Sequence, residues 1–381
     1  MTRDPSAAAE ARALKQALDP FRTLSAMRAA PEWKELEPRL RKVLDTIRRY
    51  EPDSPPPAST AHRVKAVHWN VEHGNWYDQV EAALTGHRDL QNGDLYLFNE
   101  IDLGMARAGN RDVTGDLARA LGLYGVWAPL FLETTAGRDD DPRMAAGRDN
   151  QEALFGLAIL SRWPIGQVRV LDLPSPENIQ FDLERMYGRH IALMAEILRP
   201  GGPFLAVSAH LEVHRTRAHR AVEMKTIMNA LAGERRPVIL AGDFNTHTFD
   251  RGLWHSPFTG GASLLTWPGR ALKKRLLWPD RGPFREPLFD VLREHGFEWD
   301  RFVDRLSTLQ LRLDRLDEVN VLPSWVRLPA AGILAWAEWR GALRLDWFAG
   351  RGWRTGRGFT VHGFDGRDKA SDHAPIVAEF E

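Results

Sequence analysis

Residues 240–248 read Leu240-Ala241-Gly242-Asp243-Phe244-Asn245-Thr246-His247-Thr248. The stretch follows the apolar run 237–240, which predicts a short buried strand. On an extended backbone, side chains two residues apart point to the same side, so Asp243 and Asn245 would present a carboxylate and an amide to one spot. Such a spot suits a hard cation, or a phosphate with an attacking water. The alternative is a local turn, in which both side chains hydrogen-bond the nearby backbone.

The composition limits the class of protein. The chain has 381 residues, 43% of them hydrophobic, which is enough for one large domain or two small ones. Its 51 basic and 51 acidic residues give a formal net charge of 0, so binding to nucleic acid or an anionic membrane requires a local basic patch. The chain contains no cysteine, which excludes disulfides, thiolate zinc sites and cysteine nucleophiles.

No membrane or export signal is recognised in the sequence. Residues 1–10 are polar and lack the apolar core of a signal peptide. No apolar run approaches the roughly 20 residues that a membrane-spanning helix needs. We therefore expect a cytoplasmic protein without stable membrane insertion.

The first part of the chain predicts a helical extension. Residues 6–50 combine an alanine-rich segment with an apolar face that recurs from Trp33 to Ile47, as in an amphipathic helix. A stiff proline-rich linker follows at 52–57. We interpret 1–61 as a helical N-terminal extension that packs on the main domain; the alternative is a helix that binds a membrane surface or a partner. Residues 62–381 would form the main domain, with 250–342 as a divergent insert, a substrate-facing region or plain scaffold.

Polar residues recur where short apolar strands end. Strands are predicted near 64–69, 94–98, 155–160, 190–198, 204–208, 237–240 and 376–380, and helices near 112–121, 216–231 and 288–295. The ends of the strands of one sheet edge converge on a common cleft, so these polar residues would meet there. Each of them alone has an ordinary structural explanation, such as a turn cap or a satisfied core histidine. The residues are Asn70, Glu100, His210, Asp243 with Asn245, and Asp372 with His373.

Taken in order, these motifs resemble the endonuclease/exonuclease/phosphatase superfamily, whose fold is DNase I-like. The resemblance spans residues 64–381. It implies a four-layer α+β sandwich, two packed mixed β-sheets flanked by helices, and hydrolysis of a phosphate ester with Mg²⁺ or Mn²⁺. It is carried by Trp69-Asn70-Val71-Glu72, Asn99-Glu100, Leu160-Ser161-Arg162-Trp163-Pro164-Ile165, Ala209-His210-Leu211, Gly242-Asp243-Phe244-Asn245, Arg344-Leu345-Asp346-Trp347 and Ser371-Asp372-His373-Ala374-Pro375.

The resemblance also implies a set of metal ligands. Glu100 would be the principal metal carboxylate, with Asn70 beside it. Asp372 would lie in the inner or outer shell of the metal. Glu72 stands where abasic endonucleases of the family carry an aspartate near the metal, and its longer side chain would reach toward the metal from farther out.

The same resemblance implies catalytic roles for five further residues. His373 would be the general base, and Asp346 would hold its imidazole in the right tautomer. Asp243 and Asn245 would orient the water and bind the phosphoryl group, while His210 would stabilise the phosphorane or protonate the leaving oxygen. The set is chemically coherent, because a phosphodiester repels an anionic nucleophile and a base with a pKa near neutrality is efficient there.

Substrate contacts are less clearly marked in the sequence. The loop at 105–111 follows the Glu100 strand and would place Asn110 or Arg111 on the substrate phosphate; the alternative is an ordinary surface loop. His210 resembles DNase I, the sphingomyelinases and the phosphatases, whereas exonuclease III-type enzymes carry a tyrosine there.

We expect phosphodiester hydrolysis by in-line attack of a water that His373 activates, with Mg²⁺ on Glu100. The substrate would be a nucleic acid, a nucleotide or a phospholipid headgroup, and no protein partner is inferred. Two alternatives stay open. The protein is a phosphatase or a sphingomyelinase-like hydrolase of phospholipids or inositol phosphates, or it is a non-catalytic binding module on the same fold.

Overall fold

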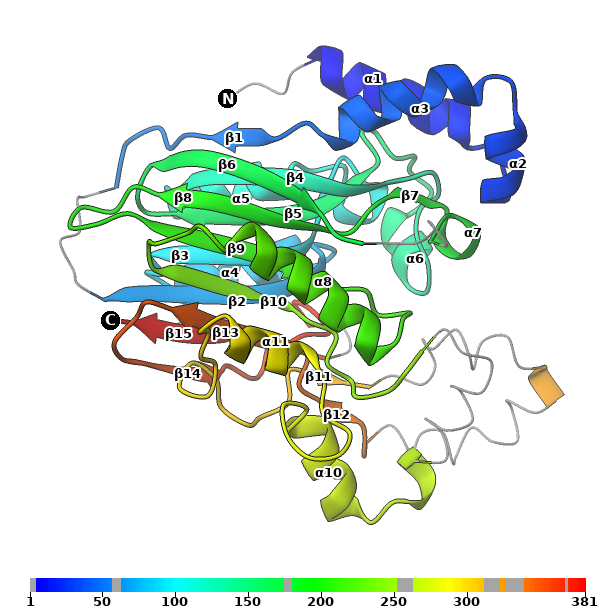
Figure 1. The fold of residues 1–381 in the computed structure, drawn as a ribbon. Coiled ribbons are helices and arrows are strands. Elements are labelled where there is room, and N and C mark those ends of the chain that lie inside the picture. Colours follow the sequence, from blue (N-terminus) through cyan, green and yellow to red (C-terminus); the bar gives the residue numbers. More distant parts are fainter. Residues whose placement is uncertain are drawn as a thin grey trace.

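Two β-sheets pack face to face between layers of helices in the computed structural model of the protein (Figure 1). The structure describes residues 5–56, 63–174, 180–251, 263–311, 323–325, 339–366 and 369–381. Apolar side chains from the inner faces of both sheets form one core cluster between them, which includes Leu97, Ile159, Val207 and Leu240. The predicted four-layer α+β sandwich is confirmed.

Among the described strands of the larger sheet, one neighbouring pair is parallel, and it lies at the centre of the sheet. This pair is β2 with β3, and the remaining neighbours are antiparallel. The strand order is β1 (Arg48–Tyr50), β4 (Tyr124–Glu133), β5 (Leu154–Ser161), β3 (Leu95–Leu103), β2 (Val64–His73), β15 (Ile376–Phe380) and β14 (Gly356–Thr360), and β7 (Met186–Gly188) also pairs with β4.

The smaller sheet likewise has one parallel pair in the described part of the chain, β9 with β10. The strands predicted near 190–198 and 204–208 are present as β8 and β9, and they pair antiparallel. The strand order is β13 (Asp346–Arg351), β10 (Val238–Asp243), β9 (Phe204–His210), β8 (Ile191–Ile197) and β6 (Ile165–Asp172), and a separate short ribbon joins β11 (Leu309–Gln310) to β12 (Ala342–Leu343).

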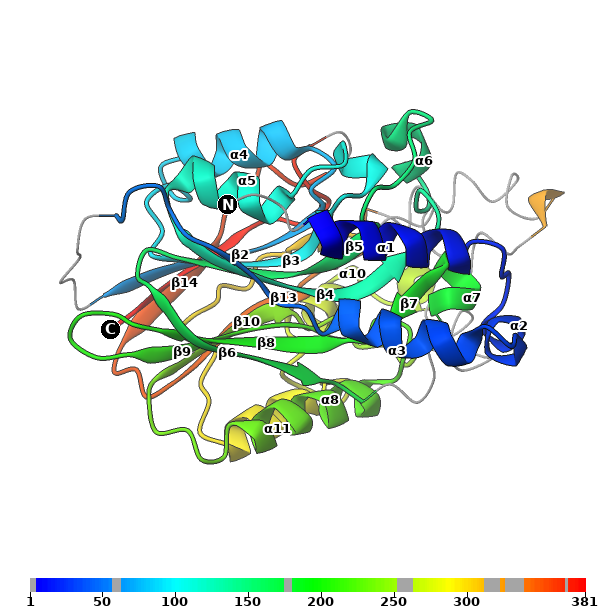
Figure 2. The ribbon, with the colours of Figure 1, turned by 90° about the horizontal axis from the view of Figure 1, so that it is seen from above.

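Helices cover the outer face of each sheet. Figure 2 shows α4 (Tyr77–Gly86) and α5 (Val113–Leu121) on one side of the sandwich, and α8 (Arg217–Ala230) and α11 (Leu288–Glu294) on the other. None of the described helices combines the length and the apolar composition that crossing a lipid bilayer requires. Further helices after residue 63 are η1 (Ala106–Ala108), α6 (Asp141–Ala145), α7 (Gln180–Glu184) and α10 (Gly269–Leu277).

The N-terminal segment forms three helices and one strand. The helices are α1 (Pro5–Leu18), α2 (Leu24–Ala29) and α3 (Trp33–Leu44), and their apolar residues share a core cluster with Trp127 and Leu132 of β4. Residues 48–50, which were predicted to be helical, instead form β1 and pair with β4. The reason is tertiary: β4 would otherwise be a long edge strand with unpaired backbone groups, and three residues of β1 cover it. Linker residues 57–61 lie outside the described part of the chain.

Part of the region 250–342 belongs to the core scaffold. Helix α11 lies beside α8 on the smaller sheet, and Phe289 packs against Trp347 of β13 with ring centroids 4.7 Å apart. The Phe302 ring stacks on Phe380 of β15 at 4.3 Å. For residues 288–303 these contacts favour the scaffold alternative, while 252–262, 312–322 and 326–338 lie outside the described residues.

A buried ionisable network supports the end of β9. His190 Nε2 lies 3.1 Å from Glu212 Oε2, and the Glu212 backbone N–H donates to Glu223 Oε2 of α8 (3.1 Å). Burial opposes a charge on His190, yet Glu212 raises the pKa of His190 to about 9, and burial raises the pKa of Glu223 to about 8. His190 Nδ1 donates to the carbonyl oxygen of His210 (3.1 Å), so the network ties this strand end to α8.

If residues 288–303 are scaffold, truncating Phe302 must destabilise the whole domain. Its side chain is 2% exposed. Phe302→Ala should lower the free energy of unfolding by about 3–5 kcal/mol, the usual cost of a large buried cavity. Leu306→Ala, at a side chain that is 50% exposed, is the control and should change it by at most about 0.5 kcal/mol. Equal, small effects in urea unfolding would show that this segment is not part of the core.

Stability should fall as the pH rises from 6.5 to 9. Since the pKa of His190 is raised from 6.5 to about 9 in the folded protein, its stabilising contribution is complete below pH 6.5 and is lost as the pH passes 9. Glu223, raised from 4.5 to about 8, acts in the same direction, with its contribution lost between those two values. Urea midpoints across this range should fall less steeply in His190→Gln than in the wild type, whereas His295→Gln should keep the wild-type slope.

Candidate active site

The two parallel strand pairs bring four of the predicted residues together at one end of the sandwich. The Asn70 amide of β2 donates to Glu100 Oε1 of β3 (3.0 Å) and, across the sheet interface, to Asp243 Oδ2 of β10 (3.3 Å). His210 Nε2, at the end of β9, lies 3.8 Å from Glu100 Oε1 and 3.7 Å from Asp243 Oδ2. Polar ends of strands from two different sheets thus converge on one cluster.

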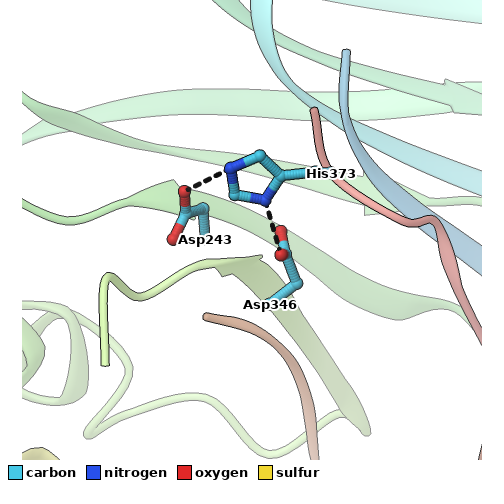
Figure 3. Close-up of side chains that lie close together, drawn as sticks. All are labelled: Asp243, Asp346 and His373. Atoms are coloured by element: carbon cyan, nitrogen blue, oxygen red, sulfur yellow. Dashed lines mark hydrogen bonds and ion pairs between the residues drawn. The ribbon is translucent and has the colours of Figure 1, made fainter. Parts of the chain in front are cut away.

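A histidine and two aspartates form the centre of this cluster (Figure 3). His373 Nδ1 donates to Asp346 Oδ2 (2.8 Å), and its Nε2 lies 3.7 Å from Asp243 Oδ2. Asp243 and Asp346 are direct partners in the register of β10 with β13. His373 lies in the segment before β15, where its backbone forms an isolated antiparallel β-bridge with Leu309. A carboxylate on one ring nitrogen fixes the tautomer and leaves the other nitrogen facing the cluster.

Asn245 lies near the cluster, but not in the way that its spacing predicts. Strand β10 ends at Asp243, and Asn245 has a left-handed backbone (φ 50°). The expectation that side chains two residues apart point to the same side holds only for an extended backbone, so it does not apply to this pair. Its N–H donates to Asp243 Oδ1 (2.9 Å), and its amide donates to the Leu211 carbonyl (2.7 Å). The local turn that was the alternative interpretation is present, and it leaves Asp243 Oδ2 facing the cluster.

A bulge in the larger sheet aims Glu100. The pairing of β3 shifts register between Phe98 and Ile101, and Glu100 has φ 52° there. Such a bulge redirects a side chain out of the normal alternation of a strand. Glu72 follows a matching shift in β2, with φ 44°, and its N–H donates to Asn70 Oδ1 (3.2 Å). Glu72 therefore orients Asn70 through its backbone.

Asp372 acts on the cluster through its charge. Burial raises the pKa of Glu100 to about 8, and the neighbouring charge of Asp372 adds to that rise. The same carboxylate helps to raise the pKa of His373. Asp372 therefore lies close enough to both residues to influence them.

Asn110 and Arg111 are engaged elsewhere. The Asn110 amide donates to the Asp149 carbonyl (3.0 Å) and its oxygen accepts from the Gln151 N–H (3.1 Å). The Arg111 guanidinium lies 3.4 Å from Asp116 and 4.4 Å above the Tyr77 ring. These contacts brace the loop against its neighbours, so the structure does not bring the two predicted substrate residues into the cluster.

Three further polar residues of the site received no role from the sequence pattern. His68 Nε2 lies 2.9 Å from Asp346 Oδ1, and His73 lies 3.8 Å from Glu100 Oε2. Asn99 Oδ1 accepts from the Asp243 N–H (2.7 Å) and thereby links the two sheets. The available signal for His68 was a polar residue inside an apolar strand, two positions before Asn70 and so on the same face.

The cluster carries an excess of negative charge. Burial, followed by the neighbouring carboxylate of Asp346, raises the pKa of Asp243. Burial also opposes a charge on Asp346, but His373 and His68 hold its pKa well below the usual range. Despite burial, Asp346 and Asp372 raise the pKa of His373 well above its usual value. His210 differs: burial, then His190 and His373, lower its pKa to about 3, so its ring is neutral.

The donor set fits a hard divalent cation. Asp243, Asp346 and His373 form a group, among the described residues, whose ligand atoms lie within 4.8 Å of one another. Within this group Asp346 and His373 are hydrogen-bonded to each other, so the oxygen atoms left for a cation belong to Asp243, Glu100 and Asn70, with the charge of Asp372 nearby. The raised pKa values of Glu100 and Asp243 show that their charges lack compensation in the protein alone. Carboxylate and amide oxygens are the ligands that Mg²⁺ and Mn²⁺ prefer.

The chain is similar to several solved structures at low sequence identity. The chain is similar to an endonuclease/exonuclease/phosphatase from Beutenbergia cavernae DSM 12333, with 15% identity over 84% of this chain and 72% of that chain and a TM-score of 0.49. It is also similar to beta toxin 275-280 from Staphylococcus aureus, with 15% identity over 83% of this chain and 99% of that chain and a TM-score of 0.48. A third similar structure is sphingomyelinase C from Streptomyces griseocarneus, with 13% identity over 84% of this chain and 100% of that chain and a TM-score of 0.47. No curated protein sequence matches the chain.

A sequence profile supplies the family. The profile of the Endonuclease/Exonuclease/phosphatase family matches residues 67–373, a span that runs from β2 to the His373 segment and includes each member of the polar cluster. The match therefore covers most of the chain and both sheets. The protein belongs to the endonuclease/exonuclease/phosphatase family.

Proposed function

We propose that this protein is a divalent-metal-dependent phosphodiesterase in which His373 activates a water for in-line attack on phosphorus. The observation that carries the proposal is the buried Asp346–His373 pair, whose free ring nitrogen faces Asp243 at 3.7 Å. Its Nδ1–H is committed to Asp346, so Nε2 is the nitrogen that would accept a proton from water when the ring is neutral. Because Asp346 and Asp372 raise the pKa of His373, this neutral form is favoured by alkaline pH. Family membership supports a phosphate ester as the substrate.

The surrounding residues complete the chemistry. Asp243, held by the Asn245 N–H, would accept a hydrogen bond from the attacking water and orient it toward phosphorus. His210 would stabilise the phosphorane by a hydrogen bond from its neutral ring, because a group with a pKa of about 3 is a poor reservoir of protons near neutrality. When bound by Glu100, Asn70 and Asp372, Mg²⁺ or Mn²⁺ would supply positive charge that neutralises the phosphate and the crowded carboxylates.

The charge of the chain bears on the substrate. Proteins that track duplex DNA neutralise many phosphates and are usually basic, whereas this chain has a formal net charge of 0. We therefore favour a small or lipid-derived phosphodiester over duplex DNA. Monoester hydrolysis by the same residues is the second candidate, and the assay below separates the two.

Hydrolysis of bis-(p-nitrophenyl) phosphate should need both the metal and His373. With Mg²⁺ or Mn²⁺, His373→Ala and Asp243→Asn should each lower kcat roughly 100- to 10,000-fold, the usual contribution of a general base and its positioned water. EDTA should abolish turnover in the wild type. His295→Ala, which removes a histidine at the end of α11, is the matched control and should keep full activity.

Each alternative outcome of this assay points to another function. Turnover of p-nitrophenyl phosphate alone would identify a phosphatase. Wild-type turnover in His373→Ala would contradict the mechanism. If neither ester is hydrolysed, the same variants should be assayed with phospholipid and nucleotide diesters. No hydrolysis of those substrates either would favour a binding module.

Metal affinity should rise with pH and depend on Glu100. Because the pKa of Glu100 is about 8 without a cation, Mg²⁺ must displace its proton below that pH. Isothermal titration should show roughly fivefold tighter binding at pH 8 than at pH 7, with proton release, because the ionised fraction of a group with a pKa of about 8 rises by that factor. Glu100→Gln should weaken binding at least about tenfold and flatten this dependence. Binding of equal strength at both values would show that Glu100 is not a ligand.

A further inference from the structure

His68 occupies an unusual place for a histidine. It lies on β2, and its ring points between the two sheets, where it packs edge to face against Phe348 with centroids 6.4 Å apart. The side chain is fully buried. A polar ring in this layer is costly unless its nitrogens are paired, so its partners decide what it does.

Both ring nitrogens of His68 face oxygen atoms of other strands. Nδ1 lies 3.1 Å from the Leu97 carbonyl on β3, and Nε2 lies 2.9 Å from Asp346 Oδ1 on β13. The first contact stays within the larger sheet. The second crosses to the smaller sheet and meets the carboxylate that holds His373.

The Asp346 carboxylate is shared between two imidazoles. In the described part of the chain, the donors to its oxygens are His68 Nε2 at Oδ1 (2.9 Å) and His373 Nδ1 at Oδ2 (2.8 Å). A carboxylate held at one oxygen can still turn, because the torsion between its sp³ and sp² carbons has a broad minimum. A second anchor on the other oxygen fixes the plane of the group.

We propose that His68 is a positioning residue that acts through Asp346 to fix the ring of His373. The three side chains form a continuous chain of hydrogen bonds from β2 of one sheet, through β13 of the other, to the segment before β15. The positioning stands on this geometry alone, and its effect on catalysis rests on the proposed function.

Two substitutions separate positioning from packing. His68→Leu introduces an apolar side chain of comparable bulk and removes the hydrogen-bond donor. In His68→Gln, the side-chain amide can reach the position of Nε2 and donate to Asp346. Tyr96→Phe is the control for lost stability, since Tyr96 lies on β3 of the same sheet and the variant loses its buried hydrogen bond to the Leu90 carbonyl (2.9 Å). His68→Asn, whose amide is too short to reach Asp346, replaces the leucine variant if that variant does not fold.

The first measurement needs no substrate. The Nδ1–H proton of His373, hydrogen-bonded to Asp346, should give a slowly exchanging downfield NMR signal, assigned by its loss in His373→Ala. We expect the signal in the wild type, in His68→Gln and in Tyr96→Phe. It should broaden or vanish in His68→Leu, while the backbone amide spectrum away from the site stays unchanged.

The second measurement follows the reaction. His68→Leu should lower kcat roughly 10- to 100-fold, as loss of a supporting partner usually does, while KM changes by at most about twofold. His68→Gln should recover most of this loss. In the His373→Ala background His68→Leu should cost nothing further, because both act through one chain.

The outcomes distinguish the two proposals. A retained His373 signal in the folded leucine or asparagine variant would overturn the positioning role and leave His68 as a core residue. An inactive wild type with the expected NMR pattern would keep the positioning role and reject the proposed function. Equal losses in His68→Leu and Tyr96→Phe would mean that stability, and not position, sets the activity.

Discussion

The site depends on carboxylates that are buried between two sheets. Asp243 and Asp346 stand opposite each other in the register of β10 and β13, and both are at most 2% exposed. Two buried like charges are costly unless donors or cations compensate them. The residues around them supply that compensation in part: two imidazoles donate to Asp346, and the Asn70 amide and the Asn245 N–H donate to Asp243. The remaining excess of negative charge is what makes a divalent cation a fitting ligand.

The topology of the sandwich brings these residues together. Each sheet has a parallel pair, β2 with β3 and β9 with β10, whose carboxyl ends lie at the same end of the molecule. Because the sheets pack face to face, polar residues at these ends meet across the interface, as Asn99 and Asp243 do. Helices α8 and α11 cover one sheet, and α4 and α5 cover the other. The His190–Glu212–Glu223 network then fixes the strand end that carries His210.

Histidines take different roles here because their surroundings differ. His373 faces carboxylates on both sides, which raise its pKa, whereas His210 lies beside two other histidines and deep in the protein, which lowers its pKa to about 3. The two rings are therefore set to opposite protonation states by their neighbours. Two histidines with pKa values shifted in opposite directions can take different roles in one site, one exchanging a proton and the other donating a hydrogen bond from a neutral ring.

The sequence by itself determined the strands that carry the cluster, the four-layer fold and the family, because apolar runs that end in Asn70, Glu100, His210 and Asp243 keep their order along the chain. Local pattern failed where the reason was tertiary. Residues 48–50 became a strand because β4 needed an edge partner, and Asn245 left the extended conformation because β10 ended two residues earlier. The bulge that aims Glu100 and the contact of His68 with Asp346 arise between strands far apart in sequence. Spacing along one strand fixes which face a side chain takes, but only the packing of two sheets decides what it meets there.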